Sequence, residues 1–246
     1  TGAGMEITSG KWIVKGVLAN MNATKNPQGE KAPVFAYRVD YSKGEFQGFG
    51  FAGVHGKAAN FSENQLDGEG NPVAQKNSRL DLFEFDAYFI RGDLTWQGQL
   101  SYGQQKKASI TPAADGSLRD AKWWGLSTLL AYKFIPRWEA TGRLDYLRNH
   151  KNGGGLFGYS YDDSHNGIGR GNGFFWDDAN PDPEAASKGA NRYALTFGLS
   201  YLVNQNAIWK LEYRYDGASQ PVFLNTKDGT FTKTNQLLGT SMVLSF

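Results

Sequence analysis

A two-residue alternation of apolar and polar side chains runs through about ten segments of the chain, each roughly ten residues long. In the segment 94–102, for example, Leu94, Trp96, Leu100 and Tyr102 alternate with threonine, glutamine and serine. Because successive side chains of a β-strand point to opposite faces, each segment is expected to be a strand with one apolar face. Strands of soluble sandwiches usually have about five or six residues, whereas a tilted strand needs about ten to cross a bilayer. The sequence therefore predicts an all-β fold, a transmembrane antiparallel β-barrel.

The expected strands follow one another along the whole chain, which indicates a single domain over residues 1–246. They cover residues 11–20, 34–41, 45–54, 80–90, 94–102, 122–134, 138–146, 193–201, 209–216 and 238–246. The segment 45–54 has aromatic residues on both faces, with Phe46 on one and Phe49 and Phe51 on the other. Its pattern therefore does not fix which face meets lipid.

Connections of two kinds alternate between these segments. Tight turns are expected at 42–44, 91–93, 135–136 and 204–206, and long polar loops at 21–33, 57–79, 104–121, 149–191 and 217–235. Structureless connections beyond about 12 to 15 residues are uncommon in compact soluble domains. Short turns on one side and long loops on the other are typical of bacterial outer-membrane barrels. We therefore expect the tight turns and the C-terminus in the periplasm and the long loops outside the cell.

The strand count leaves two alternatives open. Ten segments form an even set that closes as one barrel, and bacterial barrels have an even number of strands. Residues 2–8 also alternate, with Ala3, Met5 and Ile7 on one face. If this eleventh strand exists, we expect the sequence to be the C-terminal part of a larger barrel of about sixteen to eighteen strands.

Aromatic residues make up 14% of the chain and stand near the ends of several apolar faces, as in Trp138 with Tyr146 and Trp209 with Tyr215. Tyrosine and tryptophan collect where hydrocarbon meets headgroups, so two aromatic belts are expected. The chain has no cysteine, which excludes disulfides, thiol catalysis and cysteine metal sites. The net charge of +2 without a basic run gives no indication of a nucleic-acid partner.

The polar faces carry charges of both signs, which we expect to line a pore. Because the signs nearly cancel, strong ion selectivity is not expected. For each residue a structural salt bridge is the alternative to a role in transport. The predicted pore-lining residues are Lys15, Arg38, Asp40, Glu84, Asp86, Lys133, Glu139, Arg143, Asp145, Arg192, Lys210, Glu212, Arg214 and Asp216. Glu45 is also expected on the polar face, at the start of the strand 45–54.

Catalysis is not expected. The three histidines, His55, His150 and His165, stand near the loop side, where Asp145 or Asp163 could pair with one of them. No serine elbow, HExxH or phosphate loop accompanies them, and no cofactor or metal is expected. Loop 149–191 is rich in glycine, aromatics and acids. It could narrow the pore, present aromatic platforms to sugar, bind a hard cation such as calcium, or be a solvated surface loop.

The last eleven residues, QLLGTSMVLSF, resemble the closing strand of Gram-negative porins, which ends in an aromatic residue. The resemblance implies that Phe246 is an assembly signal read by the barrel-assembly machinery. Residues 32–41 are similar to an internal strand of proteobacterial porins, and the final sixty residues, approximately, to an uncharacterised porin-like family of that group.

These observations predict an outer-membrane porin for passive diffusion of small hydrophilic solutes, with a homotrimer as its expected assembly. The alternative is a closed structural or adhesive outer-membrane barrel whose loops bind partners. The expected surroundings are outer-membrane lipid and lipopolysaccharide.

Overall fold

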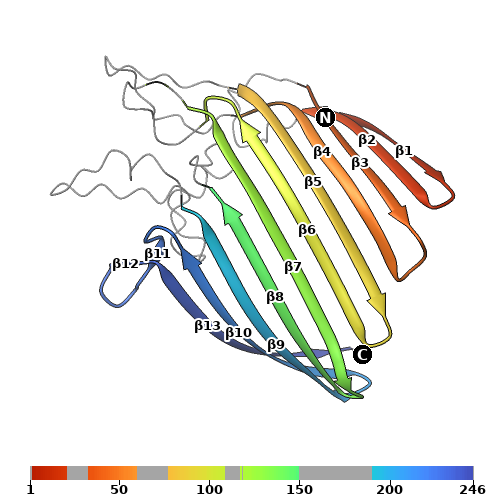
Figure 1. Ribbon diagram of the computed structural model, residues 1–246, viewed down its shortest axis with the longest axis vertical. Coiled ribbons are helices and arrows are strands. Elements are labelled where there is room, and N and C mark those ends of the chain that lie inside the picture. The colour runs from red at the N-terminus through yellow and green to blue at the C-terminus, as the bar shows by residue number, and fades with distance from the viewer. Residues whose placement is uncertain are drawn as a thin grey trace.

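The computed structural model describes residues 2–20, 33–59, 77–108, 117, 119–149 and 190–245. Eleven antiparallel strands form one sheet, in which each strand pairs with the next along the chain (Figure 1). Within the described residues no helix is long and apolar enough to cross a membrane. The strands are β1 (Gly2–Ser9), β2 (Trp12–Asn20), β3 (Pro33–Ser42), β4 (Gln47–Ala59), β5 (Asn77–Arg91), β6 (Leu94–Gln105), β7 (Ala121–Ile135), β8 (Trp138–Arg148), β9 (Arg192–Asn204), β10 (Ala207–Ala218) and β13 (Thr234–Leu244).

The optional first strand is present. β1 pairs with β2 from Gly2 opposite Ala19 to Ser9 opposite Trp12. In the described part of the chain β1 and β13 each pair with one neighbour only, so these strands form an arc with two edges, as Figure 1 shows. The predicted fold class, the antiparallel sheet of a transmembrane β-barrel, is confirmed.

Tight turns join the strands at one end of the sheet, which we call the turn end. Gly10, between β1 and β2, has φ 58°, and Gly92, between β5 and β6, has φ 57°. Only glycine adopts this left-handed region without steric cost, so it is favoured in two-residue hairpins. The opposite end, from which the long connections leave, is the loop end.

The loop end differs from the prediction in two ways. β4 continues to Ala59 and β5 begins at Asn77, because backbone pairing persists beyond the alternating segments. The expected loop 217–235 contains a hairpin of two short strands, β11 (Phe223–Leu224) and β12 (Phe231–Thr232). Its turn is closed by Gly229 at φ 71° and by a hydrogen bond from the N–H of Gly229 to the oxygen of Asn225.

The register assigns every strand residue to one of two faces, because directly paired residues lie on the same face. Gly50 pairs with both Asp40 and Asp86, which places it on the polar face. Phe49 and Phe51 therefore lie on the apolar face, which settles the orientation that the sequence left open. The expected start of this strand at Glu45 is wrong, because Glu45 lies in the turn and β4 begins at Gln47. Glu45 is thus not a polar-face strand residue.

The apolar face remains exposed over the length of the sheet. Leu100 and Leu130 are both 49% exposed, and Phe197 is 62% exposed. A soluble sandwich would bury these side chains beneath a second layer, and all eleven long strands belong to one sheet. This arrangement suits a face that is covered by lipid.

Aromatic side chains contact one another at both ends of the apolar face. At the turn end the ring centroids of Trp12 and Tyr41 are 4.8 Å apart, and Trp138 and Tyr201 are 4.6 Å apart. At the loop end the corresponding contact joins Trp124 and Tyr146 at 5.1 Å. On β7 and β8 aromatic residues thus stand at both ends of the apolar face, as the sequence predicted. On β3 to β5 they also fill the middle of this face, where Phe51 contacts Tyr37 and Phe83.

Candidate functional site

The polar face of the sheet brings the predicted pore-lining residues together. One rung of paired residues crosses it and carries Asp40, Asp86, Asp145 and Asp216. The register places all fourteen predicted residues on this face. It does not test their role in transport. They are Lys15, Arg38, Asp40, Glu84, Asp86, Lys133, Glu139, Arg143, Asp145, Arg192, Lys210, Glu212, Arg214 and Asp216.

Three strands repeat an Arg-x-Asp pair on this face. In each pair the arginine Nε donates to the aspartate two residues later at 2.8 Å, and the pairs are Arg38 with Asp40, Arg143 with Asp145, and Arg214 with Asp216. Residues two apart on a strand share a face, so each pair is encoded locally. These residues were predicted to lie on the polar face, but their pairing was not predicted, although the Arg-x-Asp spacing indicates it.

Arg38 also links two strands that are not neighbours. Its Nη1 lies 2.8 Å from Oδ2 of Asp86, and its Nη2 donates to Oδ1 of Asp86 at 3.0 Å. β4 lies between the two strands, and its Gly50 has no side chain to obstruct the guanidinium. A Cβ at Gly50 would lie 2.5 Å from Nη2 of Arg38. The glycine therefore permits this contact.

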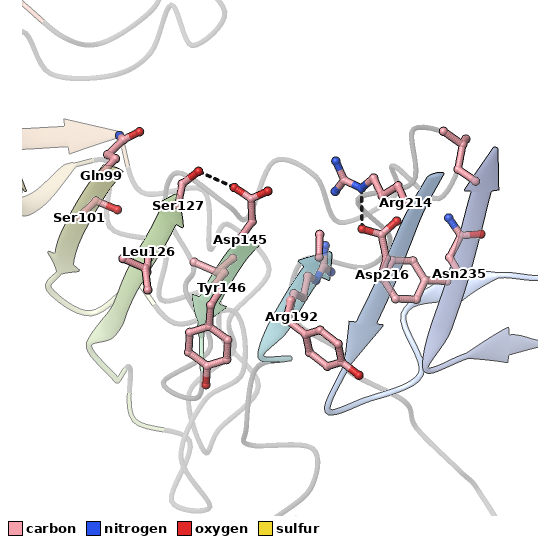
Figure 2. A pocket seen from close by; sticks show the side chains of 16 residues that line it. Gln99, Ser101, Leu126, Ser127, Asp145, Tyr146, Arg192, Arg214, Asp216 and Asn235 are labelled. Atoms are coloured by element: carbon pink, nitrogen blue, oxygen red, sulfur yellow. Dashed lines mark hydrogen bonds and ion pairs between the residues drawn. The ribbon is translucent and has the colours of Figure 1, made fainter. Parts of the chain in front are cut away.

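A cavity of about 640 Å³ lies on the polar face between β6 and β13. Figure 2 shows Asp145 and Arg214 pointing to one side of the sheet and Tyr146 to the other. Within the cavity wall the hydroxyl of Ser127 donates to Asp145 at 2.6 Å. Phe223 of β11 also lines the cavity and is itself buried, so the hairpin forms part of the wall. Side chains from six strands and the hairpin converge here, which indicates that the polar face is the concave one.

A second cavity of about 490 Å³ adjoins the first, and Gln99 and Ser127 line both. Both cavities mix the two signs of charge. Their charged lining residues are Arg38, Arg143, Arg192 and Arg214 against Glu84, Asp86, Asp145 and Asp216. The charged side chains in the walls of the two cavities thus balance, four arginines against four carboxylates.

The remaining predicted charges of the polar face line neither cavity. Lys133 and Glu139 are directly opposite each other beside the turn end. Lys15 forms an ion pair with Glu6 at 3.1 Å. Glu6 was not among the predicted polar-face residues, because residues 2–8 were expected only as an optional strand.

His55 faces away from this surface. Its Nδ1 lies 3.0 Å from Oδ1 of Asp81, and both residues have the parity of the apolar face. Asp145, which the sequence suggested as a partner for one of the histidines, contacts Ser127 and Arg143. In the described residues no group of three or more histidine, aspartate or glutamate side chains could hold a metal ion. Other named candidates lie outside the described residues, namely His150, His165, Asp163, most of loop 149–191 and Phe246.

Among the solved structures similar to the chain are two outer-membrane proteins. The outer-membrane protein OmpT of Vibrio cholerae aligns with TM-score 0.55 and 12% identity, over 99% of this chain and 63% of that one. The anion-selective porin from Comamonas acidovorans aligns with TM-score 0.59 and 9% identity, over 99% and 58% respectively. At such identity the likeness concerns the fold, and the chain spans less than two thirds of either protein.

Among curated proteins no sequence matches the chain. One family model, described as "Protein of unknown function (DUF3138)", matches residues 2–246. Because this match covers nearly the whole sequence, the chain belongs to that family.

Proposed function

We propose that the protein is an outer-membrane porin that allows passive diffusion of small hydrophilic solutes. The observation that carries the proposal is the contrast between the two faces of one sheet. The concave face holds two adjoining cavities with charged side chains of both signs in their walls, whereas the convex face exposes apolar side chains over the length of the sheet. Such a sheet suits a wet lumen inside lipid.

The lumen charges support weak ion selectivity. Both aspartates in the wall of the larger cavity are paired, Asp145 with Arg143 and Asp216 with Arg214. Selectivity in charged pores comes from rings of like charge. The name of the Comamonas porin describes an anion-selective channel. This chain's balanced wall instead favours a pore that passes both signs.

Cysteine accessibility tests the proposal, because the chain has no cysteine of its own. Ser127 lines both cavities, whereas Leu130 of the same strand lies on the apolar face, is 49% exposed and lines neither cavity. The full-length protein carrying Ser127→Cys is placed in a planar bilayer and treated with a charged thiol reagent. We expect open-channel current before treatment and a drop in single-channel current afterwards.

The matched control is Leu130→Cys, which should conduct normally and lose no current with the same reagent. If the folded full-length protein carries no reproducible current, the porin proposal is wrong and the closed adhesive barrel takes its place. Equal current loss in both variants would overturn the assignment of the faces.

The proposal extends to topology and assembly. The turn end lies in the periplasm, the loop end outside the cell, and three copies form the functional unit. Phe246 serves as the assembly signal. The proposed function includes no catalytic role, and His55 pairs with Asp81 on the face turned away from the lumen.

A further inference from the structure

The two faces exchange character at the loop end of β4 to β7. On the concave side Leu80 and Trp123 are buried in a small apolar cluster with three alanines. On the convex side the same stretch of β4 and β5 carries Lys57, Arg79 and Asp81. Since lipid-facing positions below this point are apolar, the exchange marks where these strands leave the hydrocarbon.

Two cations stand directly opposite each other at this level. Lys57 of β4 pairs in register with Arg79 of β5, so their Cβ atoms are about 5 Å apart. Both side chains are exposed, and that of Arg79 is 70% exposed. Like charges in such a position destabilise a sheet unless something neutralises them. Asp81 neutralises Arg79 with a contact of 2.9 Å, whereas the described part of the chain provides no ion pair for Lys57.

The two cations lie closer to the loop end than a rung of aromatic side chains on the same face. Phe83 pairs with Tyr102, which pairs with Trp124, all on the convex face. Arg79 is four residues from Phe83, a rise of about 13 Å along the strand. Aromatic rings of this kind mark the edge of the hydrocarbon, so Lys57 and Arg79 lie at the level of the headgroups.

We propose that Lys57 and Arg79 bind a phosphate group of the phosphorylated glycolipid in the outer leaflet. This inference rests on the proposed function, which places the loop end at the cell surface. A phosphate accepts hydrogen bonds from a guanidinium and an ammonium at once, and its negative charge balances that of Lys57, which Asp81 leaves to be neutralised. Lipid occupies this convex face, so its headgroup is the anion that the geometry brings to this level.

Binding of purified lipid A to the full-length protein tests this site. The double variant Lys57→Gln/Arg79→Gln is compared with Lys43→Gln/Arg137→Gln, whose cations lie in turns at the opposite end. Native mass spectrometry measures retention of bis-phosphorylated lipid A and of its dephosphorylated form. Loss of two charge-assisted contacts should weaken binding of the phosphorylated form about tenfold or more. The turn-end control and a Lys57→Arg variant should bind as the unmodified protein does.

Three results would overturn the lipid site. Dephosphorylated lipid A could bind equally well, inorganic phosphate alone could compete at the same concentration as lipid A, or the double variant could change only the oligomeric state. The last result would assign the patch to a contact between copies. Heat-modifiable gel mobility verifies folding. Single-channel current should be unchanged in the double variant, so a failed porin proposal and a failed lipid site give different results.

Discussion

The link between Arg38 and Asp86 should contribute measurably to stability. Arg38→Gln and Asp86→Asn, alone and together, form a double-mutant cycle that isolates the energy of this pair. The contact is two-pronged, at 2.8 Å and 3.0 Å, and the side chains are 35% and 28% exposed. Exposed pairs contribute about 0.2 to 1 kcal/mol, and breaking a buried pair costs about 3 to 5 kcal/mol. We expect an intermediate coupling of about 2 kcal/mol.

The pair Lys15–Glu6 is the internal control. It lies on the same face, but its single contact is 3.1 Å long and its side chains are 46% and 54% exposed. Its coupling should not exceed about 0.5 kcal/mol. Urea unfolding of the protein in lipid vesicles, followed by tryptophan fluorescence, gives both values. The reasoning is refuted if the Arg38–Asp86 coupling is no larger than that of Lys15–Glu6.

Three further outcomes are expected. Gly50→Ala should destabilise the sheet by about 1 to 2 kcal/mol in the same unfolding assay, because the new Cβ would displace the Arg38 guanidinium. Gly142→Ala is the control, because nothing lies within 4 Å of its new Cβ, and it should be neutral or stabilising. Phe223→Ala should raise single-channel conductance, because the ring lines the larger cavity, and an unchanged conductance would contradict this role for the hairpin. Hydrogen bonds from the hydroxyl and N–H of Thr230 hold the pKa of Asp228 below its usual value. The stabilisation of the hairpin turn by these bonds is therefore fully present above the usual carboxyl pKa of about 3.9. It is lost as the pH falls through the lowered pKa of Asp228. Amide exchange at Thr230 should accelerate over that acid range, and Asp228→Asn should abolish the pH dependence.

The sequence predicted the faces of the strands well because strand periodicity is local. A residue such as Asp145 needs only its neighbours to be assigned to the polar side. Strand bounds at the loop end and the hairpin β11–β12 were missed, because pairing there does not follow an apolar alternation. The orientation of β4 required the pairing of Gly50 with Asp40 and Asp86, which is a long-range property.

The site shows the same division between local and long-range information. The three Arg-x-Asp pairs of the polar face follow from spacing, but the contact of Arg38 with Asp86 depends on a glycine in the strand between them. No periodicity in β3 alone indicates which side chain lies two strands away. Glycine opposite a long polar side chain is the kind of signal that only a known register can interpret.

The fourth Arg-x-Asp pair shows why the motif alone does not define a pore residue. Arg79 donates to Asp81 at 2.9 Å, as its counterparts do, yet this pair lies on the convex face. Between the two, Leu80 points to the concave side and is fully buried. The same three-residue pattern therefore has opposite meanings above and below the edge of the hydrocarbon. Its position relative to the aromatic rung, rather than its composition, decides whether the arginine meets the lumen or the lipid headgroups.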